Sequence, residues 1–140
     1  MSDRVFLDTN IFVSSFDHSA PRKAAKSRGL IRDALASHKG VVSYQVVQEF
    51  FNVALRRFAR PMKALEAEQY LGTVFRPLLA VHSSAALYSD ALRLQGQGGL
   101  SWYDALIVGA AVQSGCDVLL TEDLQDGRSL GKLRIANPFL

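Results

Sequence analysis

The chain has 140 residues, a length that suits one domain around one core, and we expect a single domain over residues 1–140. Hydrophobic residues make up 49% of it, which excludes a disordered chain, and no apolar run approaches the roughly 20 residues that cross a membrane. One cysteine, Cys116, excludes an internal disulfide framework and suits a cytoplasmic protein. The net charge of +3 is mild evidence for an anionic partner.

Short apolar runs alternate with longer stretches of helical periodicity. Prolines, serines and glycines mark where the helices begin and end. The elements expected in chain order are a strand at 5–7, a helix from Pro21 to about Ser37 ended by Gly40, a strand at 41–42, a helix capped by Ser43, a helix opened by Pro61 and closed by Pro77, a strand at 78–81, a helix from Ser83 or Ser84 to the cluster Gly96, Gly98 and Gly99, a helix over 102–113 capped by Ser101, and strands at 118–120 and 133–136. This alternation predicts an α/β fold, in which helices flank a central parallel sheet of about five strands.

Four carboxylates fall where parallel α/β proteins bind ligands, beyond the carboxyl ends of the strands. Asp8 and Asp123 directly follow the first and the fourth expected strand. Glu49 lies in the helix after the second strand, and Asp104 lies in the first turn of the helix that follows the glycine cluster. We therefore expect all four side chains at one rim of the sheet.

Each acid also has a purely structural interpretation. The first lies in DTN (8–10), which is good turn and cap chemistry. Asp104 fits a capping box with Ser101, worth ~1 kcal/mol, while Glu49 could be a solvated helix residue and Asp123 a loop residue. Taken singly, the structural interpretation is favoured for Asp104 and Asp123. For all four acids together, it requires a coincidence at one edge of the sheet.

A cluster of carboxylates is more readily explained by a bound cation. Clustered carboxylates repel one another, so their pKa values rise unless a cation compensates. Because the site would offer oxygen ligands only, the expected ion is Mg²⁺ or Mn²⁺. Such an ion lowers the pKa of a bound water and stabilises charge on a phosphoryl oxygen. Asp8 is then a metal ligand that a buried strand presents.

The motifs DTN (8–10), VVQEF (46–50), YDALIVGAA (103–111) and LLTEDLQDG (119–127) stand in the order and context of PIN-domain ribonucleases. The chain resembles this family over essentially its whole length, and most closely the VapC-like toxins of bacterial toxin–antitoxin pairs. The ordered set of four motifs is specific, although no single one is. The resemblance implies a pocket that binds Mg²⁺ or Mn²⁺ and hydrolyses RNA phosphodiester bonds, a small antitoxin that blocks this pocket, and a homodimer.

The resemblance also implies a role for each matched residue. The metal ligands would be Asp8, Asp104 and Asp123, with Glu49 as a further ligand or as the base that positions a water. Hydrogen bonds that orient these carboxylates would come from Thr9, Asn10 and Thr121. Because Glu122 and Asp126 lie close to Asp123 in the sequence, Asp126 is kept as a second candidate for the last acid.

Three other functions share parts of this pattern. A phosphatase or phosphotransferase with Asp8 as its nucleophile would often carry a second aspartate where this chain has Asn10. A response-regulator receiver would need a late lysine, and only Lys132 is available. A non-catalytic PIN-like module that binds RNA or a protein would keep the same acids and remains open.

Two basic runs and one aromatic pair could contact RNA. Trp102 and Tyr103 flank Asp104, and one of them could stack on a base, although core packing is the commoner use. The basic residues could bind phosphates or form solvated helix faces. They are Arg22, Lys23, Lys26 and Arg28 in one run, and Arg56, Arg57, Arg60 and Lys63 in the other.

Overall fold

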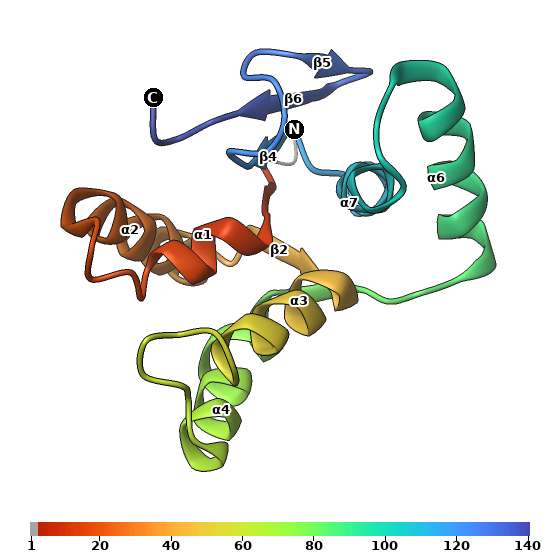
Figure 1. Cartoon of the computed structure of the whole chain (residues 1–140). Coiled ribbons are helices and arrows are strands. Elements are labelled where there is room, and N and C mark those ends of the chain that lie inside the picture. Colours follow the sequence, from red (N-terminus) through yellow and green to blue (C-terminus); the bar gives the residue numbers. More distant parts are fainter. Residues whose placement is uncertain (1–2) are drawn as a thin grey trace.

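The computed structural model describes residues 3–140, so the first two residues of the expected domain lie outside it. Its centre is a six-stranded sheet in the order β3-β2-β1-β4-β6-β5 (Figure 1). Neighbouring strands are parallel except for β5 and β6, which are antiparallel. The strands are β1 (Val5–Leu7), β2 (Gly40–Ser43), β3 (Leu79–Val81), β4 (Val118–Leu120), β5 (Ser129–Leu130) and β6 (Leu133–Ala136). The expected α/β fold is confirmed, and all five expected strands are present.

Helices cover both faces of the sheet. Figure 1 shows α1 and α2 on one side of the central strands and α6 and α7 on the other. The helices are α1 (Thr9–Ser14), α2 (Pro21–Ser37), α3 (Tyr44–Ala54), α4 (Ala64–Tyr70), the π-helical turn η1 (Leu71–Phe75), α5 (Arg76–Leu78), α6 (Ala85–Gly98) and α7 (Trp102–Gln113). Within residues 3–140, no helix is both long and apolar enough to cross a membrane.

The end of α2 corrects one expected boundary. The helix ends at Ser37 as expected, but its left-handed cap is His38, with φ of 59°, and not Gly40. Gly40 is instead the first residue of β2. A Cβ atom on Gly40 would lie 2.5 Å from the Cβ atom of Ala34, which real Cβ atoms do not tolerate. The glycine therefore lets α2 pack closely on β2.

The segment between α3 and β3 corrects a second boundary. The helix expected to open at Pro61 begins at Ala64, where the Glu66 carboxylate accepts a hydrogen bond from the Lys63 amide at 3.0 Å. Pro77 does not close the helical region, because it lies inside the short helix α5. Proline is tolerated there since the first turn of a helix needs no amide donor.

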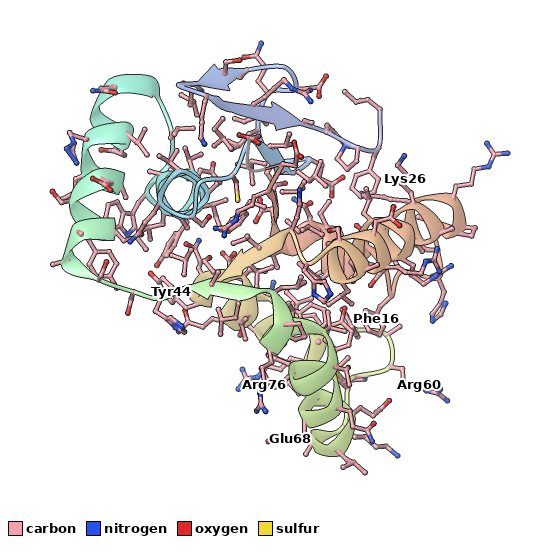
Figure 2. The ribbon with its side chains drawn as sticks, turned by 180° about the vertical axis from the view of Figure 1, so that it is seen from behind. Phe16, Lys26, Tyr44, Arg60, Glu68 and Arg76 are labelled. Atoms are coloured by element: carbon pink, nitrogen blue, oxygen red, sulfur yellow. The ribbon has the colours of Figure 1, made fainter. Side chains whose placement is uncertain are left out.

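The core has two parts, one on each side of the sheet. In α7, seven consecutive residues (105–111) are buried, because this helix packs against α6 as well as β2 and β4. On the other side, an aromatic cluster joins α1, α3, α4 and η1. The rings of Phe50 and Tyr70 are stacked with 5.0 Å between their centroids, and those of Phe12 and Phe75 are tilted at 4.9 Å. Figure 2 shows Phe16 entering this cluster from the end of α1. Both parts hold the helices that carry the acids in place.

The topology creates a crevice at one edge of the sheet. From β1 the chain moves to β2 on one side, and it later returns to β4 on the other side of β1. In such sheets, ligands bind beyond the carboxyl ends of the strands at this switch point. Asp8 follows β1 and Thr121 follows β4, so both lie at the expected edge.

Candidate functional site

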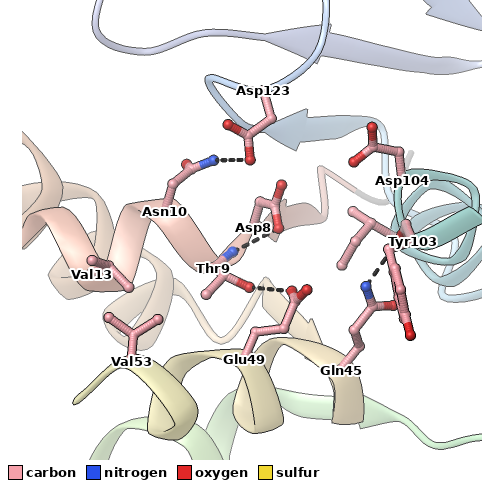
Figure 3. A pocket seen from close by; sticks show the side chains of 11 residues that line it. Asp8, Thr9, Asn10, Val13, Gln45, Glu49, Val53, Tyr103, Asp104 and Asp123 are labelled. Carbon is pink, nitrogen blue, oxygen red and sulfur yellow. Dashed lines mark hydrogen bonds between the residues drawn. The ribbon is translucent and has the colours of Figure 1, made fainter. Parts of the chain in front are cut away.

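A pocket of about 300 Å³ lies beyond the carboxyl ends of β1 and β4. Figure 3 shows Asp8, Glu49, Asp104 and Asp123 around one open space. Among the described residues that line it there is no lysine, arginine or histidine. The lining residues are Asp8, Thr9, Asn10, Val13, Gln45, Glu49, Val53, Tyr103, Asp104, Ile107 and Asp123. Four separate segments thus bring the four predicted acids to one pocket.

Asp8 combines a structural role with a place in the pocket wall. It is the N-cap of α1, and its Oδ1 accepts a hydrogen bond from the Thr9 amide at 2.7 Å. Its Oδ2 accepts one from the Thr121 hydroxyl at 2.8 Å. Only 6% of the residue is exposed. Both carboxylate oxygens are therefore held in fixed directions, although the group is almost cut off from water.

Burial raises the pKa of Asp8 from its usual 3.8 to about 6. The hydrogen bonds from Thr121 and Thr9 lower this pKa, and the negative charges of Asp123 and Glu49 raise it further. Ionised Asp8 is consequently costly in the protein alone. A cation in the pocket would favour the ionised form and offset that cost.

The three polar residues expected to orient the acids all make hydrogen bonds to them or to one another. Thr121 donates its hydroxyl hydrogen to Asp8 and accepts the Asp123 amide at 3.1 Å. The Asn10 side-chain amide donates to Asp123 Oδ2 at 3.1 Å and to the Thr121 hydroxyl at 3.3 Å. The Thr9 hydroxyl donates to Glu49 Oε1 at 2.8 Å. These bonds link β1, α1, α3 and β4 around the pocket.

Thr121→Val is expected to destabilise the protein by about 1–3 kcal/mol. Valine has the same shape, but it removes one donor and one acceptor at a fully buried position, and Asp8 then loses the hydroxyl that stabilises its charge. Thr121→Ser retains the hydroxyl and serves as the control. Urea denaturation followed by circular dichroism measures the free energy of unfolding, and equal midpoints for the valine and serine variants would contradict the assigned role.

Asp104 is not needed as the cap of α7. Ser101 provides the cap, because its Oγ accepts a hydrogen bond from the Asp104 amide at 3.2 Å. Within residues 3–140, no hydrogen bond reaches the Asp104 carboxylate. The structural and the functional interpretations thus fall on different atoms of the same residue, and the carboxylate remains available to the pocket.

The three acids of the loop after β4 point in different directions. Asp123 lines the pocket. Glu122 pairs with Lys23 on α2, with 2.6 Å between Oε2 and Nζ. Asp126, the second candidate, accepts a hydrogen bond from the Asn137 amide at 2.8 Å and does not line the pocket. The geometry favours Asp123 as the fourth acid of the site.

Gln45 is a pocket residue that the sequence analysis missed. It is 5% exposed, and its Nε2 donates to the Tyr103 carbonyl at 3.2 Å. Its Oε1 is buried without a hydrogen-bond partner in residues 3–140, as is Oδ1 of Asn10. A spacing of four residues places Gln45 on the same face of α3 as Glu49, and this spacing was the available signal.

The donor set fits a hard divalent cation. The pocket offers carboxylate and amide oxygens, which suit Mg²⁺ or Mn²⁺. Two of its amide oxygens lack a donor within residues 3–140, and the pKa of Asp8 is raised by burial and, to a smaller extent, by the charges of Asp123 and Glu49. As the side chains stand within residues 3–140, no three acidic, histidine or cysteine side chains are grouped closely enough to hold one ion. Side-chain rotation is therefore needed for the acids to share an ion.

Comparisons with known proteins agree with this geometry. The profile of the PIN domain family matches residues 5–125. No protein with a curated description matches the sequence significantly.

Several solved structures have a similar fold. A toxin–antitoxin complex from Klebsiella pneumoniae has a TM-score of 0.65 at 19% identity, covering 96% of this chain and 97% of that one. FitAcB from Neisseria gonorrhoeae has a TM-score of 0.64 at 19% identity, covering 96% and 98%. The sarcin-ricin-loop-cleaving toxin VapC20 from Mycobacterium tuberculosis has a TM-score of 0.56 at 20% identity, covering 82% and 86%. At these identities the likeness shows a shared fold.

Proposed function

Because the chain belongs to the PIN domain family, whose members are typically nucleases, we propose that it is a metal-dependent endoribonuclease and the toxin of a type II toxin–antitoxin pair. The observation that carries this proposal is the convergence of four carboxylates on one pocket, whose lining within the described residues includes no basic side chain. Such a pocket would repel an RNA phosphate on its own. A bound divalent cation reverses the sign of that interaction.

Asp8, Asp104 and Asp123 are the proposed holders of Mg²⁺ or Mn²⁺. When bound, the ion supplies a water of lowered pKa and stabilises charge on the phosphoryl oxygens. Asp8 is pre-positioned by its two hydrogen bonds, and Asp123 by the Asn10 amide. Asp104 lies in the first turn of α7, whose backbone Ser101 caps, so only its side chain has to rotate. These supports limit the reorientation needed to gather the three acids.

Glu49 is proposed as the base that positions the attacking water, or as a further ligand. Its Oε1 accepts the Thr9 hydroxyl, which leaves Oε2 to accept a proton from water. Attack in line with the leaving oxygen would give a 5′-phosphate and a 3′-hydroxyl.

Basic side chains on two elements are proposed to attract the RNA. Arg22, Lys26 and Arg28 on α2 are exposed, as are Arg56 and Arg57 after α3. Figure 2 shows Lys26 and Arg60 extending outward from the ribbon. With four of the 13 acids gathered in the pocket, nine remain against 16 basic residues. The surface outside the pocket is therefore strongly positive, as binding to phosphates requires.

A small protein partner and a homodimer are proposed on the same grounds. One of the similar structures is a toxin–antitoxin complex, and another is FitAcB. An apolar hollow of about 560 Å³ between α1, α2 and η1 is lined by Phe16, Ile31, Leu35 and Val74, with Arg28 and Arg32 also lining it. Apolar surface of this kind marks protein interfaces.

The proposed RNA substrate and the free Cys116 thiol fit a cytoplasmic location.

The test is cleavage of a mixed RNA pool by the purified protein in Mg²⁺ or Mn²⁺, beside an EDTA control. Discrete cleavage is expected with either metal and none with EDTA. Asp123→Asn should lower the rate at least about a hundredfold, since even residues that only support metal ligands contribute about 10- to 100-fold.

Asp126→Asn is the matched control, because it makes the same chemical change in the same loop outside the pocket. It should cleave like the parent. RNA binding without metal-dependent cleavage would instead indicate the non-catalytic module. An equal loss of cleavage rate in the two variants would show that the substitutions act by disturbing the loop and not by removing the Asp123 carboxylate.

A further inference from the structure

Tyr103 is an exposed aromatic residue in the wall of the acidic pocket. It lies on α7 directly before Asp104, and 65% of its surface is exposed. Figure 3 shows its ring beside Gln45, on the Asp104 side of the pocket. Exposure of a large ring in a pocket wall contributes little to folding, which suggests that it serves a ligand.

The neighbouring aromatic residues are used differently. Trp102 is half-buried against the core and lies 6.3 Å from the Tyr88 ring. Within residues 3–140, no ring–ring pair involves Tyr103. Of the two aromatic residues that precede Asp104, Trp102 therefore belongs to the fold, and only Tyr103 presents its ring to the pocket.

Gln45 contacts the backbone of Tyr103 and adds a polar group next to it. The Tyr103 carbonyl can only accept a hydrogen bond, so the Gln45 side-chain nitrogen must face it at 3.2 Å. The orientation of the amide is thereby determined. Its Oε1, which lacks a partner among residues 3–140, is a buried acceptor on a side chain that lines the same pocket. A buried acceptor without a donor is costly, and a donor on a ligand would satisfy it.

We propose that Tyr103 and Gln45 form a nucleobase subsite beside the acidic pocket. The Tyr103 ring stacks on the base of a nucleotide next to the scissile phosphate, and Gln45 Oε1 accepts an N–H of that base. This inference rests on the proposed function, because the acids would hold the phosphate through their cation. Only an unpaired base can turn out of its stack to reach the ring.

The stacking test uses short single-stranded oligoribonucleotides that carry the fluorescent base 2-aminopurine at successive positions. Binding is measured with Mn²⁺ in a Glu49→Gln background, which prevents cleavage in every arm. At one position, stacking on Tyr103 should quench the fluorescence. Tyr103→Leu should abolish this quenching and weaken binding roughly tenfold, while Tyr103→Phe retains both. Tyr88→Leu makes the same change outside the pocket and should behave like the parent.

An abasic nucleotide separates stacking from general loss of structure. In the parent, an abasic nucleotide at the quenched position should weaken binding as much as Tyr103→Leu does. In Tyr103→Leu the same abasic nucleotide should cost nothing more. For Gln45, the readout is the preference among oligonucleotides that differ only in this base. Gln45→Met, similar in size, should keep the quenching and equalise the affinities.

Three results would overturn the proposal. If Tyr103→Leu binds RNA as tightly as the parent, the ring is not a base platform, although the nuclease assignment stands. If this variant changes the sedimentation coefficient of the free protein, the ring is a subunit contact. If the parent binds no RNA in Mn²⁺, the proposed function fails and the subsite fails with it.

Discussion

Asp8→Asn is expected to lower metal-dependent RNA cleavage by at least about a hundredfold, because a ligand contributes more than the ~10- to 100-fold of a residue that only supports one. The substitution keeps the cap of α1, since the asparagine oxygen can still accept the Thr9 amide. It removes the charge that would bind the cation. The measurement is the initial rate on the RNA pool in Mn²⁺, together with the Mn²⁺ affinity from electron paramagnetic resonance.

Asp17→Asn is the matched control for this substitution. Asp17 is exposed, and its Oδ1 accepts hydrogen bonds from the amide and hydroxyl of Ser19, so an asparagine can replace it. It does not line the pocket. The Asp17 variant should cleave like the parent. If Asp8→Asn retained metal-dependent cleavage, Asp8 would be only a helix cap, and the proposed site would lose its central ligand.

The structure shows why structural and functional interpretations of these acids compete in the sequence. Asp8 caps α1 with one oxygen and meets Thr121 with the other. At Asp104 the backbone amide serves the cap while the carboxylate reaches the pocket. A sequence cannot separate atoms of one residue. The sequence did predict that all four acids lie together, and all four line one pocket. For Asp8 and Asp123 the reason is that the carboxyl ends of parallel strands meet at one edge.

The features that the sequence analysis missed depend on contacts rather than on local patterns. The two-residue strand β5 has no periodicity of its own and exists through pairing with β6. The π-helical turn η1 has no local sequence signal, and its last residue, Phe75, packs against the Phe50 ring of α3. Gln45 resembles any polar residue on an amphipathic helix until the Tyr103 carbonyl is seen opposite it. Tertiary structure therefore decides which polar residues complete a site.

The stability of the metal-free protein is expected to fall as the pH rises through about 6. In the unfolded chain, Asp8 ionises near 3.8, whereas in the folded protein its pKa is about 6 because of burial. Between these values the folded state retains a proton that the unfolded state has released, so stability decreases with rising pH. The pKa difference of about two units corresponds to about 3 kcal/mol at ~1.4 kcal/mol per unit. This stability is fully present below pH 4 and lost above pH 6.

Comparison with Asp8→Asn isolates this contribution from other titrating groups. The variant cannot ionise at this position, so the free energy of unfolding of the parent relative to the variant should fall by about 3 kcal/mol between acid and neutral pH in EDTA. Asparagine forfeits the Thr121 hydrogen bond, worth about 1 kcal/mol, at every pH. At neutral pH the metal-free variant should therefore be more stable than the parent by about 2 kcal/mol.

Mn²⁺ should reverse this order. An ion that binds only the folded state stabilises it by mass action, and it does so through the ionised Asp8 of the parent. Urea denaturation at neutral pH should give a higher midpoint for the parent with Mn²⁺ than with EDTA, and an unchanged midpoint for the variant. The contradicting result is a free energy of unfolding of the parent, relative to the variant, that neither falls with rising pH nor rises with Mn²⁺. That result would show that the ionised form of buried Asp8 is not destabilised in the folded protein. The Asp8 carboxylate at the end of β1 would then not be the group that binds the cation.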